Sequence, residues 1–181
     1  PAPESRAAIG EWLGALDLDH RPGTGLRPDG LPDIDWVRID DEHAPFYIGR
    51  YLVTNRQWQA FIDDGGYDND RWWAGLAERM KPTAPFWTEP TAPREMVNWY
   101  EAIAYCRWLS AKSGQEVTLP TEAQWERAAR GVTGREYAWG DDWMPDRTNA
   151  EFRIQRTTAV GLYPDGATPE GVQDMTGNVW E

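Results

Sequence analysis

The stretch Val117–Gly131, V-T-L-P-T-E-A-Q-W-E-R-A-A-R-G, predicts a strand, a corner and a helix. Its first three residues alternate apolar and polar side chains as a half-buried strand does, and Pro120 ends that strand because it lacks an amide proton. Thr121 is a favourable N-cap, and Gln124 three residues later completes a capping box. Gly131 stands where a helix commonly ends in a left-handed residue.

Two more capping boxes predict helices elsewhere in the chain. Thr54 with Gln57 and Asn98 with Glu101 each have the spacing at which two side chains satisfy the first free amides of a helix. A shorter helix is predicted for residues 5–18, with Ser5 as its N-cap. Strands are expected at residues 34–39 and 46–53, where apolar side chains alternate with polar ones or gather on one face.

The stretch L-P-T-E-A-Q-W-E-R-A-A-R-G resembles the signature of the formylglycine-generating-enzyme (sulfatase-modifying factor) family. Four further stretches resemble that family in the same order: Phe46–Gln57 (F-Y-I-G-R-Y-L-V-T-N-R-Q), Val97–Leu109 (V-N-W-Y-E-A-I-A-Y-C-R-W-L), Tyr137–Asp141 (Y-A-W-G-D) and Gly171–Glu181 (G-V-Q-D-M-T-G-N-V-W-E). The resemblance implies a C-type-lectin-like fold. This is an α+β domain with two to three short helices, short antiparallel strands and much irregular structure.

The resemblance also predicts how the chain is organised. We expect residues 1–33 to form a helix and a Pro/Gly-rich arm, and residues 34–181 to form the formylglycine-generating-enzyme-like domain, incomplete at its C-terminus. The arm is similar to a linker that precedes this domain in larger multidomain chains. An upstream module in a longer chain is therefore expected.

Composition limits the partners and the compartment. The net charge of −12 argues against nucleic acid and against an anionic membrane surface, because both bind clustered Lys and Arg. No apolar run approaches the length of a membrane span. The single cysteine excludes an internal disulfide and favours the cytoplasm as the location. Most of the 12 Trp are expected to be structural, since large rings can fill a core with few regular elements.

No catalytic residue is assigned from the sequence. The family's copper oxidases use two Cys beyond the G-N-V-W-E motif, whereas this chain has only Cys106, which is predicted on the buried side of a helix. The family's iron-dependent members draw three ligands from a His-rich helical partner domain. Here only His20 and His43 occur, and both are expected to be solvated surface residues. Neither copper nor iron is therefore supported by this chain.

The resemblance implies one candidate metal site, and it is structural. In formylglycine-generating enzymes the matching C-terminal segment wraps a calcium ion, which prefers oxygen ligands. By that motif, Asp174 and Glu181 would give side-chain oxygens, and Gly177 and Val179 would give backbone carbonyls. The alternative is that Asp174 and Asn178 only satisfy turn amides.

Two classes of function remain open from the sequence. The first is a non-catalytic binding domain for an unidentified protein or small-molecule ligand, as in the variable proteins of diversity-generating retroelements. Its support is the absence of a catalytic constellation, the linker-like arm and the many aromatic residues. The alternative is a fragment of a copper oxidase or of a related iron-dependent enzyme whose catalytic residues lie outside this chain.

Overall fold

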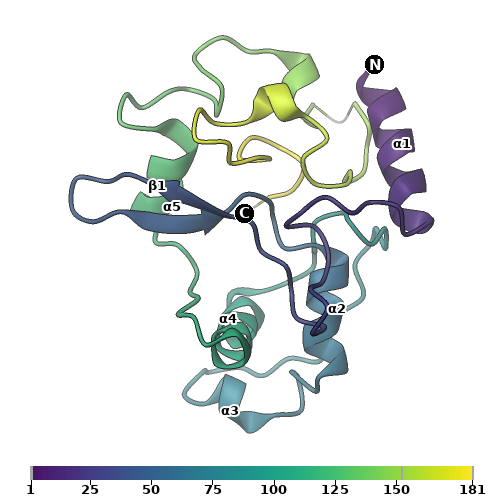
Figure 1. The fold of residues 1–181 in the computed structure, drawn as a ribbon, viewed down its shortest axis with the longest axis vertical. Helices are drawn as coiled ribbons and strands as arrows, with labels where there is room; N and C mark the ends of the chain where they lie inside the picture. Colours follow the sequence, from purple (N-terminus) through teal and green to yellow (C-terminus); the bar gives the residue numbers. More distant parts are fainter. Residues whose placement is uncertain (1, 152, 181) are drawn as a thin grey trace.

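The computed structural model describes residues 2–151 and 153–180. Figure 1 shows short elements joined by long irregular segments, which confirms the expected α+β class. Within the described residues the elements are α1 (Pro3–Ala15), β1 (Trp36–Ile39), β2 (Phe46–Gly49), α2 (Asn55–Asp63), α3 (Asp70–Trp73), α4 (Trp99–Ser113), α5 (Glu122–Arg130) and two 3₁₀ turns, η1 (Pro145–Arg147) and η2 (Pro164–Gly166).

All three predicted capping boxes form. Thr54, Asn98 and Thr121 each accept a hydrogen bond from the third helical amide, while Gln57, Glu101 and Gln124 accept from the cap residue's own amide. Both helix ends fall at the expected glycines, but only Gly114 of α4 is left-handed, with φ 73° and ψ 10°; Gly131 of α5 has φ 66° and ψ −167°. Local sequence therefore sets the bounds of the three central helices.

The hairpin of β1 and β2 is shorter than the predicted strands. The two strands are antiparallel, and the paired residues run from Trp36 opposite Gly49 to Ile39 opposite Phe46. Beyond Gly49 the chain leaves the ladder. The Arg50 amide donates to the Asp35 carbonyl at 2.7 Å, and the Arg50 carbonyl accepts from the Gln173 amide at 2.8 Å.

Residues 117–119 are not a strand, so that prediction is wrong. No neighbouring strand pairs with them among the described residues. The Val117 amide instead donates to the Ser110 hydroxyl of α4 at 2.8 Å, and that hydroxyl donates to the Val117 carbonyl at 3.0 Å. A side chain of α4 thus replaces the ladder that an alternating pattern normally implies.

The N-terminal helix begins three residues earlier than predicted and ends at Ala15 rather than Leu18. α1 starts at Pro3, and the residue before it, Ala2, makes no side-chain cap; Ser5 therefore lies inside the helix. Proline is favoured at the first helical position because its missing amide proton would have no partner there.

Two clusters of buried side chains hold the molecule together. The larger is aromatic and joins α2, α3 and α4 around Phe61, which contacts the rings of Trp58, Tyr67, Tyr105 and Trp108. The smaller packs the hairpin onto α5 and the C-terminal segment through Val37, Ile39, Ala128, Ala129, Ala138, Val172 and Met175. In Figure 1 the aromatic cluster belongs to the lower half of the view and the aliphatic cluster to the upper half.

Candidate functional site

A cleft of about 1150 Å³ separates the two clusters. Its walls come from the hairpin, from α4, from the segment that leads into α5, and from residues 172–180. Most of the lining side chains are apolar or aromatic, and the aromatic ones include Trp36, Tyr47, Trp99 and Trp125. Small-molecule sites typically occupy roughly 300–1000 Å³ and have a mainly apolar lining, so this cleft is the candidate site.

Two tryptophans on opposite walls are held with their rings partly exposed. Trp36 opens β1 and is 37% exposed, while Trp99 opens α4 and is 59% exposed. The Asn98 capping box fixes the backbone at Trp99, and the Trp99 ring meets the Tyr100 ring edge-on at 5.3 Å. Rings with open faces are suited to stack on a planar ligand or to hold a cation.

Tyr105 lies at the base of the cleft with an unsatisfied hydroxyl group. Its ring stacks on Trp58 at 4.8 Å, and the residue is 3% exposed. Burial raises the pKa of Tyr105, so the phenol is protonated at any physiological pH. The hydroxyl has no hydrogen-bond partner among the described residues. A buried polar group without a partner is a place where a ligand or a water can bind.

Cys106 also lines the cleft, and its thiol has low reactivity. It is a free thiol on the buried side of α4, as expected, and burial raises its pKa to about 11. The thiolate is the reactive form of cysteine, so a thiol with this pKa is a poor nucleophile or metal ligand at neutral pH.

Arg94 and Gln173 add unmatched polar atoms to the lining. Arg94 Nε and Gln173 Oε1 have no hydrogen-bond partner among the described residues. Burial lowers the pKa of Arg94, its guanidinium lies 5.9 Å from the centre of the Trp58 ring, and it donates to the Thr83 carbonyl. These atoms and the Tyr105 hydroxyl are themselves buried, so a ligand in the cleft would reach them only after the lining side chains move.

The structure places Asp174 inside the protein, facing a backbone amide. Asp174 is 8% exposed, and its Oδ2 accepts from the Gly161 amide at 2.7 Å. Burial raises the pKa of Asp174 to about 6, against the opposing effects of that hydrogen bond and of Arg21. The alternative sequence interpretation, that this carboxylate satisfies a turn amide, describes the contact that is present.

Two of the other three predicted calcium ligands, Gly177 and Val179, lie in the described part of the C-terminal segment. The Gly177 carbonyl accepts from the Val179 amide at 3.0 Å, and Val179 itself lines the cleft. Glu181 lies outside the described residues. Across residues 2–151 and 153–180, no group of three His, Cys, Asp or Glu side chains is placed to hold a metal ion. The calcium site stays a prediction.

The histidines lie at the surface, as predicted. His20 and His43 are both exposed and belong to separate segments of the chain. No helix in the described part of the chain combines the length and the apolar composition needed to cross a membrane.

The family assignment follows from the sequence match. Residues 38–181 match the model of the sulfatase-modifying factor enzyme 1-like domain, which is most of the chain. The chain belongs to the formylglycine-generating-enzyme family. Helices α2, α4 and α5 lie inside the matched residues, whereas the first two residues of β1, Trp36 and Val37, precede them.

The family's named relatives include enzymes. The chain is 41% identical over 161 residues to the hercynine oxygenase of Mycolicibacterium thermoresistibile; the match covers 75% of this chain and 34% of that protein. It is 30% identical over 233 residues to the formylglycine-generating enzyme of Streptomyces coelicolor; that match covers 100% of this chain and 70% of the relative. The chain thus spans about a third of the hercynine oxygenase.

A solved structure supports the fold assignment. PvdO from Pseudomonas aeruginosa superposes with a TM-score of 0.60 at 22% identity, covering 86% of this chain and 71% of that one. At this identity the likeness shows the fold alone.

The comparisons overturn the expected function. We expected a non-catalytic ligand-binding domain, but relatives at 37–41% identity are named as hercynine oxygenases, and a relative matched over the whole of this chain is named as a formylglycine-generating enzyme. The alternative, a part of an enzyme, therefore fits better. The absence of a Cys pair or a His triad misled the interpretation, because about two thirds of a hercynine oxygenase lies outside the matched region.

Sequence reasoning also missed the cleft. Its walls come from segments more than a hundred residues apart, so no local pattern indicates that they meet. Trp99 lies on the apolar face predicted for α4, three residues before Ala102 and seven before Cys106, so the sequence pattern does not indicate its exposure.

Proposed function

We propose that this chain is the formylglycine-generating-type domain of an oxygenase, and that its cleft binds a histidine betaine such as hercynine. The observation that carries the proposal is the 41% identity to a hercynine oxygenase over 161 residues. The formylglycine-generating enzyme, although matched over the whole of this chain, is less similar at 30% identity.

The chemistry of the cleft supports such a ligand. Hercynine carries a quaternary ammonium group, which has no hydrogen to donate and is recognised best by the faces of aromatic rings. Trp36 and Trp99 offer such faces on two walls. The Tyr105 hydroxyl, which can donate, and Gln173 Oε1, which can accept, have no partner among the described residues, but both are buried and would meet the ligand only after the lining side chains move.

The residues of this chain do not fit an iron or copper centre. The only thiol, Cys106, is buried with a raised pKa, and the two histidines are exposed and apart. We therefore assign this chain the binding and orientation of substrate, and no metal-dependent step.

The test is a tryptophan-fluorescence titration of the purified protein with hercynine. Because one cation–π contact contributes about 0.5–2 kcal/mol, Trp36→Ala and Trp99→Ala should each weaken binding roughly 3- to 30-fold. Trp87→Ala is the matched control, since Trp87 is 40% exposed and lies outside the cleft. An equal loss in the control, or no saturation up to millimolar hercynine, would refute the proposal.

A further inference from the structure

α1 has two apolar faces, and only one of them touches the protein. The inner face consists of small residues, among them Ala7, Gly10 and Gly14, all of which are buried. A Cβ atom added at Gly10 would lie 2.7 Å from Leu162 Cδ1, and one added at Gly14 would lie 2.1 Å from Glu89 Oε1. The helix backbone therefore sits directly against the body of the domain.

Ion pairs fix which face of α1 looks outward. Glu4 pairs with Arg153 at 2.8 Å, Glu11 pairs with Arg156 at 2.6 Å, and Asp17, just past the helix, pairs with Arg56 at 2.7 Å. Exposed ion pairs of this kind contribute little to stability individually. Their consequence here is geometric, because each carboxylate of α1 points back to the domain and is neutralised there.

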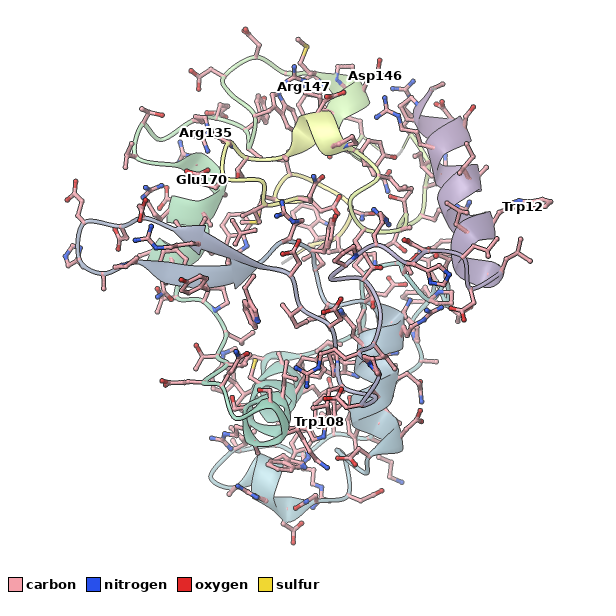
Figure 2. The ribbon with its side chains drawn as sticks, in the orientation of Figure 1. Trp12, Trp108, Arg135, Asp146, Arg147 and Glu170 are labelled. Atoms are coloured by element: carbon pink, nitrogen blue, oxygen red, sulfur yellow. The ribbon has the colours of Figure 1, made fainter. Side chains whose placement is uncertain are left out.

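The outer face carries large apolar side chains. Ile9, Trp12, Leu13 and Leu16 follow the i, i+3, i+4, i+7 spacing of one helix face, and their exposed fractions are 52%, 69%, 38% and 60%. In Figure 2 the labelled Trp12 side chain points away from the protein. By helical geometry Ala2 and Ser5 share this face, and Arg6 lies at its edge, where it donates a hydrogen bond to the Asp146 carbonyl.

An exposed apolar face of this kind is expected to be covered by another molecule. A contiguous exposed apolar patch marks an interaction site. An anionic lipid surface is disfavoured, because Arg6 at the edge is the one basic residue near this face and the protein has a net charge of −12. The best complement is another uncharged helical face of the same width, and a second copy of this chain provides one.

We propose that two copies of this chain associate through the outer faces of α1, related by a two-fold axis. The same residues then contact each other across the axis, as in an isologous interface. With Leu18, which follows the helix and is 55% exposed, the apolar side chains offer on the order of 500 Å² per copy. A pair would bury about 1000 Å², the lower bound for a specific interface, so association in the micromolar range is expected.

The test is the mass of the purified protein by sedimentation velocity between 1 and 100 µM. The expected result is a species of twice 20.7 kDa at the higher concentrations. Trp12→Glu and Leu16→Glu should each abolish it, with unchanged thermal unfolding because both side chains point to solvent. Val132→Glu is the matched control, since Val132 is 74% exposed and follows α5; it should associate as the unmodified protein does.

Three results would overturn the proposal. A protein that is monomeric at 100 µM would leave another polypeptide as the occupant of the α1 face. A dimer that survives both glutamate variants would place the contact elsewhere. Cosedimentation of the monomer with phosphatidylcholine vesicles, lost in Trp12→Glu, would assign the face to a lipid surface.

Discussion

The two halves of the molecule are stabilised in different ways. In the half built on α2, α3 and α4, capped helices present aromatic rings to one another around a fully buried Phe61. In the C-terminal segment 131–180, regular structure is limited to η1 and η2 among the described residues. Of the six non-glycine residues with positive φ in the described part of the chain, four lie in that segment: Glu151, Gln155, Asp174 and Asn178. The helical half depends on the burial of aromatic rings, whereas the loop half combines the smaller aliphatic cluster with side chains that hold strained turns.

The largest loss of stability should follow from removing the central ring of the aromatic cluster. Phe61→Ala removes a ring that is fully buried and contacts four others, so it should lower the free energy of unfolding by about 3–5 kcal/mol. Urea denaturation measures this change. Phe86→Ala is the control, since Phe86 is 73% exposed, and it should change stability by less than about 0.5 kcal/mol. Similar losses from both would contradict a burial-based account.

A smaller loss should follow from breaking the polar centre of the loop half. Asn178 Oδ1 accepts from the Thr158 amide at 2.8 Å and from Asn149 Nδ2 at 3.2 Å, and its Nδ2 donates to the Thr158 carbonyl at 3.1 Å. Asn178→Ala should destabilise by about 2–3 kcal/mol. Asn178→Gly loses the same bonds but accepts the φ of 69°, so it should recover about 1 kcal/mol of that loss. Urea denaturation of both variants decides; equal stabilities would show that the backbone is unstrained.

The loop half should also contain the pH-dependent carboxyl group. Because burial raises the pKa of Asp174 to about 6, its stabilising contribution is present below the unfolded pKa near 3.8 and is lost as pH rises through 6. Asp174→Asn keeps an oxygen for the Gly161 amide without the charge. It should match the original protein near pH 4 and be more stable by about 2 kcal/mol at pH 7.5.

The test is the free energy of unfolding of the original protein and of Asp174→Asn, measured at both pH values, with calcium and with a chelator. A difference that is independent of pH would contradict the assignment. Calcium that stabilises the original protein but not Asp174→Asn would support the predicted metal site instead.

The smallest effect should come from a single capping residue in the helical half. Thr121→Ala removes the side chain that accepts from the Gln124 amide at 3.2 Å and should cost about 1 kcal/mol in unfolding free energy. Thr121→Ser retains the hydroxyl and serves as the control. If chemical denaturation gave equal losses for Ala and Ser, the cap would not be the cause.

The same contrast explains what the sequence could predict. Capping boxes are local signals, so the starts of α2, α4 and α5 follow directly from Thr54, Asn98 and Thr121. The pattern that predicts a strand is only partly local, because a strand also needs a neighbouring strand to pair with. Residues 117–119 alternate as a strand does, yet their partner is Ser110 of a helix, and nothing in the stretch itself indicates that. The cleft needs β1, α4 and residues 172–180 together, which only the tertiary fold provides.

The functional prediction failed for a related reason. It rested on residues that the chain lacks, whereas the relatives carry their activity on much longer chains. What this chain contributes is the aromatic cleft, with Trp36 and Trp99 on its walls and Tyr105 at its base.

Isothermal titration calorimetry of the purified protein with hercynine and with histidine tests that contribution most directly. The two ligands differ by the three methyl groups of the quaternary ammonium. We predict saturable binding of hercynine at one site and an affinity for histidine at least about tenfold weaker, corresponding to about 1.4 kcal/mol of cation–π recognition. Equal affinities, or no heat of binding from either ligand at millimolar concentration, would contradict the assignment of the cleft.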